Sequence, residues 1–410
     1  MALISNKLFF ADNDERMFIG TNSYNSTSVP SYVGIITHPS IAAEDYFGLS
    51  VAVGYGKIVV GAFADDIGIG LTDAGSAHIY DLNRNYIGII THPSAAAYDY
   101  FGNSVAVGSG RIVIGAYTDD VNGLTNAGSA HIYDLNGNYI GIITHPSAAA
   151  NDSFGRSVAA GSGRIVVGSS SDDVNGIVYA GSAHIYDLNG SYVGILTHPN
   201  AASYDYFGRS VSVGSGRIVV GAPDAGVDGI GNAGSAHIYD LNGNYVGILT
   251  HPSASVNDSF GVSVAVGSGR IVVGARYDTV SGITNAGSAH IYDLSGNYIT
   301  QITHPSASGS DNFGQSVAVG SGRIVVGAYN DDVNGVANVG SALIYDLNGN
   351  YVGIITNIRS SEGDNFGQSV AVGSGRIVVG AASTDANGLY DSGAAFVYST
   401  PDHQHILDIL

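Results

Sequence analysis

Two sets of histidines recur along the chain, and imidazole is well suited to metal binding and to proton exchange near neutral pH. The first set lies within Ser-Ala-His-Ile-Tyr and consists of His78, His131, His184, His237 and His290. The second set precedes proline and consists of His38, His92, His145, His198, His251 and His304, with Asn357 in the seventh position. Leu343 and Phe396 replace histidine in the first set. These apolar replacements predict a packed surface, where a neutral imidazole needs one hydrogen-bond partner.

We expect structural roles for both sets. A repeated His-Pro pair is typical of strand ends, because proline cannot donate to a β-ladder and restricts the residue before it. Equivalent histidines of neighbouring repeats are expected to lie too far apart to share a metal, whose bonds are about 2 Å long. The alternative is a pH response in which the histidines take up protons together.

Polar and aromatic residues gather in two long loops of each repeat. Tyrosine together with Asn and Asp suits a sugar, because the aromatic face stacks on the ring while amides and carboxylates bond the hydroxyls. The candidate ligand-binding residues are Tyr98, Asp119, Asp120, Asn122, Asp172, Asp173, Asn175, Asp331, Asp332 and Asn334.

One loop has the spacing of a calcium-binding loop, with Asn330, Asp332, Asn334 and Asn338 as the candidate ligands. Two partial versions occur, at 224–232 and 385–391. All of them contain few carboxylates. The residues are therefore interpreted first as turn formers that bond their own backbone, with Ca²⁺ as the alternative. No cofactor is required by the sequence.

Two further charged residues recur in every repeat. An aspartate stands two residues before each Phe-Gly pair, as in Asp99, and predicts a turn that accepts backbone N–H groups. An arginine or lysine, as in Arg111, begins the second strand of each repeat and is expected to neutralise nearby carboxylates or carbonyls. No Asp, Glu, Ser or His stands outside the repeat as a nucleophile with its base, and differences between repeats look small and scattered. We therefore expect a protein that is not an enzyme.

The repeat that positions these residues is about fifty-three residues long. Phe-Gly pairs begin at Phe47, Phe101, Phe154, Phe207, Phe260, Phe313 and Phe366. In the second unit, four runs rich in Val, Ile, Tyr and Thr, at 104–107, 111–115, 129–135 and 139–144, predict short strands. Gly-Ser-Gly and Asn-Gly favour tight hairpins between strands one and two and between strands three and four. The sequence predicts an all-β, seven-bladed β-propeller with four antiparallel strands per blade.

The ends of the repeated region predict how the ring closes. The last unit stops after its third strand, while residues 32–37 form a fourth strand with no partner upstream of the first Phe-Gly. Pairing the two fragments completes one blade and removes the free edges. Both tight turns then lie on one side of the disc, and both long loops lie on the other.

The pattern Phe-Gly, Ser-Val-Ala-Val-Gly-Ser-Gly-Arg-Ile-Val-Val-Gly-Ala and Ala-Gly-Ser-Ala-His-Ile-Tyr-Asp resembles the FG-GAP repeats of bacterial and phage surface proteins, and more distantly the integrin α propeller. The resemblance covers residues 32–399 and implies the propeller fold and an adhesive role. The literal Gly-Ala-Pro occurs once, at 221–223. The resemblance implies a calcium loop between strands one and two, but the three-residue glycine turns here cannot supply its oxygen ligands.

Composition excludes several classes of function. The chain has 14 Lys and Arg against 34 Asp and Glu, a formal charge of −20, which argues against nucleic-acid binding. It has no cysteine, and therefore neither disulfides nor thiolate metal sites. No secretory signal peptide and no segment for membrane insertion is recognisable.

These observations predict a structural or binding module, and a virion or extracellular surface is the expected location. The expected partner is a repeated ligand such as a surface glycan, or neighbouring subunits of a particle contacted through an N-terminal arm, residues 1–31. Residues 400–410 are expected to form a C-terminal tail. The alternatives are a secreted adhesin or lectin-like glycan binder and a carbohydrate-active enzyme that uses the mouth of the axial channel.

Overall fold

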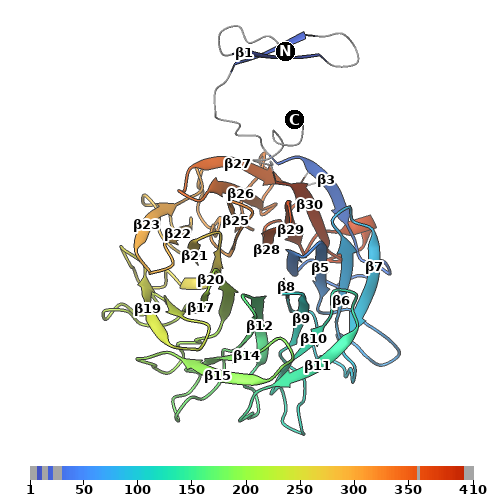
Figure 1. Ribbon diagram of the computed structural model, residues 1–410, viewed down its shortest axis with the longest axis vertical. Helices are drawn as coiled ribbons and strands as arrows, with labels where there is room; N and C mark the ends of the chain where they lie inside the picture. The colour runs from blue at the N-terminus through green and yellow to red at the C-terminus, as the bar shows by residue number, and fades with distance from the viewer. Residues whose placement is uncertain (1–6, 12–16, 22–29, 358–360, 401–410) are drawn as a thin grey trace.

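A computed structural model describes residues 7–11, 17–21, 30–357 and 361–400. Strands β1 (Lys7–Ala11) and β2 (Met17–Thr21) pair with each other in antiparallel orientation. Seven four-stranded antiparallel sheets follow and form a closed ring (Figure 1). Much of the expected arm at 1–31, and all of the expected tail except Thr400, lie outside the described residues.

The blades are numbered from the N-terminus, each beginning with its innermost strand. Blade 1 contains β4 (Ser50–Gly54), β5 (Lys57–Ala62), β6 (Ser76–Asp81) and β7 (Tyr86–Thr91). Blade 2 contains β8 (Ser104–Gly108), β9 (Arg111–Ala116), β10 (Ser129–Tyr133) and β11 (Tyr139–Thr144). Blade 3 contains β12 (Phe154–Gly161), β13 (Arg164–Ser169), β14 (Ser182–Tyr186) and β15 (Tyr192–Thr197). Blade 4 contains β16 (Ser210–Gly214), β17 (Arg217–Ala222), β18 (Ser235–Tyr239) and β19 (Tyr245–Thr250).

Blade 5 contains β20 (Phe260–Gly267), β21 (Arg270–Ala275), β22 (Ser288–Tyr292) and β23 (Tyr298–Ile302). Blade 6 contains β24 (Ser316–Gly320), β25 (Arg323–Ala328), β26 (Ser341–Asp346) and β27 (Tyr351–Thr356). Blade 7 contains β28 (Ser369–Gly373), β29 (Arg376–Ala381), β30 (Ala394–Ser399) and β3 (Tyr32–Ile36), and a short 3₁₀ turn, η1 (Ala386–Gly388), lies between β29 and β30.

The split blade closes the ring as the sequence predicts. Strand β3 pairs with β30 in antiparallel orientation, with Tyr32 opposite Tyr398 and Ile36 opposite Ala395. In Figure 1 the blue β3 and the red β28 to β30 lie together in one blade. The prediction of ring closure is confirmed, and the paired strand ends at Ile36.

The core lies at the seams between blades. One buried cluster joins Val59, Ile79 and Ile90 of blade 1 to Phe101 and Ile112 of blade 2, and equivalent clusters occupy the other seams. The phenylalanine of every Phe-Gly pair is fully buried. Each blade therefore buries its apolar faces against its two neighbours, which is the main source of stability for this architecture.

Two glycines of each repeat permit the blades to approach closely. Gly102 has a φ of +94°, and a Cβ there would collide with the carbonyl oxygen of Ser76. Gly115, in β9, faces the next blade, and its Cβ would collide with the carbonyl oxygen of Gly155. The Phe-Gly and Gly-Ala pairs of the repeat are thus two sides of one backbone contact.

The arginines that begin the second strands tie consecutive blades together. Arg111 Nε donates to the carbonyl of Leu188 in the next blade, at 2.9 Å. The same contact is made by Arg164, Arg217, Arg270 and Arg376, to Leu241, Leu294, Leu347 and Leu82. The predicted neutralisation of carbonyls is confirmed. Arg323 is the exception, because blade 7 takes its fourth strand from the N-terminus and lacks the turn that would accept, and Arg323 Nε is buried without a partner.

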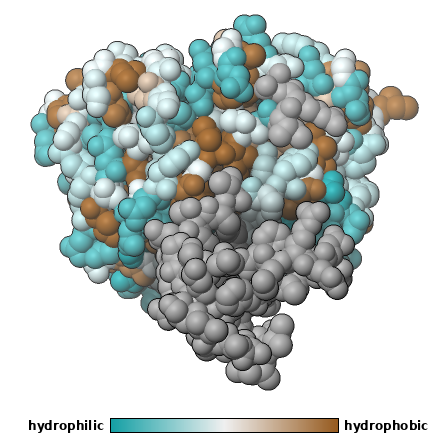
Figure 2. Space-filling model, turned by 90° about the horizontal axis from the view of Figure 1, so that it is seen from above, coloured by the Kyte–Doolittle hydropathy of each residue, from teal (hydrophilic) through white to brown (hydrophobic). Residues whose placement is uncertain are grey.

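The outermost strands expose apolar side chains at the rim of the disc. In β7, Tyr86, Ile87 and Ile89 are exposed, and the pattern repeats in β11, β15 and β19. Figure 2 views the disc from its edge, where hydrophobic patches lie among hydrophilic ones. Among the described residues there is no helix with the length and apolar character needed to cross a membrane.

Backbone contacts confirm that the two long loops share one face. The amide of Tyr98, in the loop that leads into blade 2, donates to the carbonyl of Thr72, in the loop between β5 and β6. The amide of Phe101 donates to Ala74 in the same way. We refer to this side of the disc as the long-loop face.

Candidate functional site

A buried hydrogen-bond network connects the two histidine sets across the seams. Between blades 2 and 3, His145 Nε2 lies 3.2 Å from Asp172 Oδ2, which also accepts a bond of 2.6 Å from Ser182 Oγ. Ser182 Oγ lies 2.9 Å from His184 Nε2. The rings of His145 and His184 meet edge to face at 4.3 Å. We call these four residues and their counterparts the seam network.

The donors and acceptors of the network can be assigned from its contacts. The amide of Ser147 donates to His145 Nδ1, so that Nε2 carries the proton donated to Asp172. Ser182 also donates to Asp172, and therefore accepts from His184 Nε2. His184 Nδ1 is buried without a partner, and burial lowers the pKa of His184 to about 3. This histidine is neutral, as predicted from its apolar replacements.

The seam network is complete at four seams. At one seam it joins His38 with Asp65, Ser76 and His78, and at the other three the equivalent residues are joined to His92, His145 and His251. At the seam between blades 3 and 4, Ala225 replaces the aspartate. Burial lowers the pKa of His198 there, whereas Asp65 and Asp45 outweigh burial and raise the pKa of His38.

Each donor of the network is already used in a hydrogen bond, and the bond from the first histidine to the aspartate holds two blades together. In a complete network, one nitrogen of each histidine and one oxygen of the aspartate lie within 4.8 Å of one another, so that these atoms could also coordinate a metal ion. The incomplete seams keep the same fold, with Leu343 or Phe396 packed in place of the second histidine. The contacts therefore support a structural role.

Three aspartates expected to be displayed as ligand-binding residues belong to this network instead. Asp119, Asp172 and Asp331 are only 8%, 8% and 5% exposed, and each lies within 3.3 Å of a histidine Nε2. The prediction that the loops display them is wrong. The histidine stands 27 residues earlier in the chain and reaches the aspartate only after the blades pack.

The neighbouring aspartates are exposed but serve as turn formers. Asp120, Asp173 and Asp332 accept the backbone amides of Asn126, Tyr179 and Asn338, respectively. Exposed Asn122, Asn175 and Asn334 have φ near +54° at the loop tips.

The candidate calcium ligands are used in the same way. Asp332 bonds the amide of Asn338, and Asn334 forms the tip with Gly335, between the paired residues Val333 and Val336. Asn330 is half-buried at the start of this loop. These contacts support the interpretation of the four residues as turn formers.

The aspartates before the Phe-Gly pairs fill the role predicted for them. Asp99 Oδ2 accepts the amide of Ala96 at 2.6 Å, and each of the other six accepts the amide three residues before it. The residues on either side, such as Tyr98 and Tyr100, have positive φ. The aspartate thus holds a tight loop, which presents two tyrosines before blade 2 and before blade 4.

Aromatic rings form an arc on the long-loop face. Tyr46 stacks on Phe63 at 5.4 Å, Phe63 contacts Tyr100 at the same distance, and Tyr100 stacks on Tyr117. The guanidinium of Arg156 lies 5.0 Å above the ring of Tyr117. Tyr98 is 55% exposed beside this arc, as its predicted role in binding requires.

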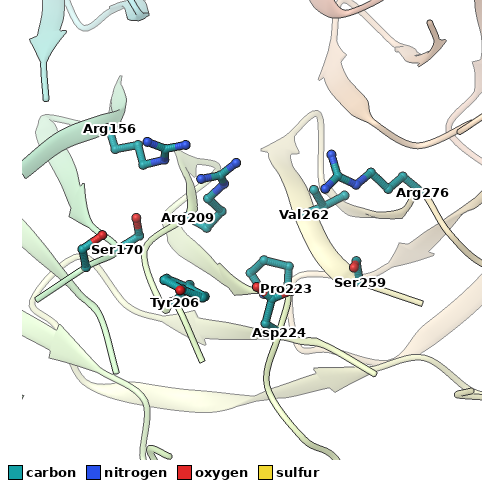
Figure 3. A pocket seen from close by; sticks show the side chains of 10 residues that line it. Arg156, Ser170, Tyr206, Arg209, Pro223, Asp224, Ser259, Val262 and Arg276 are labelled. Carbon is teal, nitrogen blue, oxygen red and sulfur yellow. The ribbon is translucent and has the colours of Figure 1, made fainter. Parts of the chain in front are cut away.

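The axial channel opens beside the arc, and its mouth is not symmetric. The residue after each Phe-Gly pair lines the mouth, and these residues are Leu49, Asn103, Arg156, Arg209, Val262, Gln315 and Gln368. A cavity of about 360 Å³ lies at blades 3, 4 and 5, lined by Arg156, Arg209, Arg276, Tyr206 and Asp224 among others (Figure 3).

The expectation that differences between repeats are scattered is therefore wrong at this place. Three arginines from three blades converge on one cavity, although they stand at two different positions of the repeat. Aligning the residues after Phe-Gly and after Gly-Ala would have shown arginine in adjacent units. Their convergence follows only from the ring.

The FG-GAP repeat model matches seven segments of the chain, residues 32–80, 87–133, 140–186, 191–239, 245–292, 299–345 and 354–398. No curated protein matches the chain. The matched segments span all seven blades, and each begins at or near an outermost strand and ends in the third strand of the next blade. The chain belongs to the FG-GAP repeat family.

Proposed function

We propose that this protein is a binding module without catalytic activity or a required cofactor, and that it attaches to glycans through its long-loop face. The observation that carries the proposal is the arc of tyrosines and phenylalanine beside the axial mouth. Aromatic faces on rigid loops bind sugar rings at little cost in conformational entropy. Exposed Tyr98 extends the arc toward solvent, and exposed Tyr204 contacts Tyr179 and Tyr206 in a second aromatic cluster.

The repeated architecture favours a repeated ligand. Similar loops around one ring act as several weak sites, and their combined affinity rises through effective concentration. A polysaccharide on a cell surface is a ligand of this kind. We place the module on a virion or at an extracellular surface, where residues 1–31 would join it to neighbouring subunits. A secreted adhesin has the same binding chemistry and differs in its attachment.

Binding of the purified chain to a glycan array tests the proposal, with product release from the same glycans measured in parallel. Changing Tyr98→Asn and Tyr204→Asn introduces the residue that blades 3 and 5 carry at this position, at Asn151 and Asn257. We expect each change to weaken binding about fivefold or more, because a stacked aromatic contributes about 1 kcal/mol.

The matched control is Tyr55→Ser, because Tyr55 is exposed on the opposite face and the other six blades carry serine there. Retained binding in the control together with loss in the two loop variants supports the proposal. Equal binding by all variants, or steady release of cleaved sugar, contradicts it.

A further inference from the structure

Three of the fourteen basic residues of a strongly acidic chain line one cavity at the axial mouth. Arg156 lies near the start of β12, Arg209 precedes β16, and Arg276 follows β21. Figure 3 shows the guanidinium groups of Arg156 and Arg209 next to each other, with that of Arg276 extending toward the same opening from the other side. The cavity has one lining carboxylate, Asp224.

Two of the three arginines, Arg156 and Arg209, are not used to hold the fold. The guanidinium of Arg209 has no hydrogen bond or ion pair with another residue in the part of the chain that the structure describes, and it is exposed to solvent. Among the residues that the structure describes, the guanidinium of Arg156 makes only the ring contact with Tyr117. Arg276 lies over the ring of Tyr277 at 4.5 Å and donates to Gln315 at 2.8 Å, while its Nε is buried with no partner among the described residues. The donors of Arg156 and Arg209 are therefore the ones most available to a ligand.

Placing three positive charges around one cavity costs free energy unless an anion offsets them. Although part of the Arg209 side chain is exposed, lost hydration of its guanidinium, reinforced by the charges of Arg156 and Arg276, lowers its pKa to about 10, so that it remains charged at neutral pH. Burial raises the pKa of Asp224, although Arg209 and Arg276 act in the opposite direction. At neutral pH the cavity keeps an excess of positive charge inside a protein whose net charge is −20.

The other lining groups fit a sugar that carries this anion. Tyr206 lies on one wall and stacks on Tyr179, while Ser170, Ser171 and Ser259 supply hydroxyls. The volume is at the lower end of the range of about 300–1,000 Å³ that is typical of small-molecule sites. Guanidinium groups bind carboxylates through paired, charge-assisted hydrogen bonds.

We propose that this cavity binds a carboxylate-bearing sugar, with Arg156, Arg209 and Arg276 holding the carboxylate and Tyr206 contacting the ring. The site adjoins the aromatic arc of blades 1 and 2 through Arg156, which lies over Tyr117, and as a glycan subsite it rests on the proposed function. It gives one sector of a nearly symmetric ring a preference for an acidic unit of the glycan.

Calorimetric titration with disaccharides tests this assignment. The probes are glucuronosyl-glucose, galacturonosyl-glucose and mannuronosyl-glucose, each paired with the neutral disaccharide that lacks only the carboxylate. We expect at least one acidic probe to bind about tenfold or more tightly than its neutral counterpart, and the preference to shrink as salt is added. Equal affinity for every pair overturns the assignment.

Substitutions taken from sister blades separate the site from the fold. Arg156→Gln and Arg209→Gln introduce the residue of Gln315 and Gln368, and each is expected to lose about tenfold in affinity for the acidic probe. Arg84→Gly removes the same charge elsewhere and introduces the glycine that five other blades carry. An equal loss in this control overturns the assignment, because it would show a general charge effect.

Inorganic sulfate and a tyrosine variant distinguish a sugar from a free anion. Tyr206→Ser introduces the residue of Ser153 and Ser259, and should weaken the acidic disaccharide but not sulfate. If sulfate displaces the disaccharide at equal concentration, the sugar assignment is wrong. If neutral glycans bind through Tyr98 while acidic ones gain nothing, only this inference fails, whereas absence of all glycan binding removes the proposed function as well.

Discussion

The seam network and the axial cavity use the repeat in opposite ways. At four seams the network repeats with histidine to aspartate distances between 3.1 and 3.3 Å, and every donor is used inside the protein. The cavity draws its arginines only from blades 3, 4 and 5, and the guanidinium groups of Arg156 and Arg209 make no hydrogen bond within the described part of the chain. Residues that repeat maintain the ring, and residues that depart from the repeat form the candidate ligand site.

Blade 4 shows both rules in one loop. Its Ala-Pro-Asp-Ala sequence places a carboxylate at Asp224, one position before the seam-network aspartate of the other blades, which is Ala225 here. The seam loses the partner of His198, and the carboxylate lines the arginine cavity instead. The departure from the repeat thus moves one acidic group from the framework to the candidate site.

The largest effect is expected at a backbone contact between blades. In Gly168→Ala, the new Cβ would collide with the carbonyl oxygen of Gly208, so that blades 3 and 4 must separate. We expect a loss of about 3 kcal/mol in the free energy of unfolding, the upper part of the usual cost of overpacking. Urea denaturation measures it. The control is Gly194→Ala in β15, where a Cβ meets nothing within 4 Å, and an equal loss there would contradict the seam explanation.

An intermediate and pH-dependent effect is expected in the network. The unfolded state protonates His184 below pH 6.5, whereas the folded state does so only near pH 3. Stability from this residue is therefore lost as the pH falls, by about 1.4 kcal/mol per pH unit between these limits. In His184→Leu, which introduces the residue of Leu343, this loss is absent.

Unfolding free energies of the wild type and His184→Leu, measured from pH 7.5 to pH 4.5, test this effect. Aspartates such as Asp152, whose pKa is raised by burial, contribute with the opposite sign but are present in both proteins. The free energy of unfolding of the wild type minus that of the variant should fall steadily as the pH drops below 6.5. A constant difference would show that the histidine is not held neutral.

The smallest effect on stability is expected at the axial cavity. Arg209→Gln should change the free energy of unfolding by less than about 0.5 kcal/mol, because the side chain is exposed and makes no hydrogen bond or ion pair within the described part of the chain. The same denaturation series measures it. A loss comparable to that of Gly168→Ala would place Arg209 in the framework and remove the contrast between the two regions.

The sequence is sufficient to predict the ring because its signals are local. The Phe-Gly pairs, the Asn-Gly turns and the unpaired strand before Phe47 are each recognisable from a few consecutive residues. The seam network could not be predicted, because His145 and Asp172 belong to different blades and look like a strand end and a turn when considered alone. The arginine cavity is harder still, since Arg156, Arg209 and Arg276 come from three blades and line one cavity only in the closed ring.

The pairing of β3 with β30 also determines how the ring responds to force. Tyr32 lies opposite Tyr398, and the amide of Ser399 donates to Ser31, so the chain enters and leaves the propeller at one point of blade 7. Tension between the two flanking segments would break these hydrogen bonds one after another, starting from that point. Blade 7 would yield first, and the other six would remain folded until it had opened.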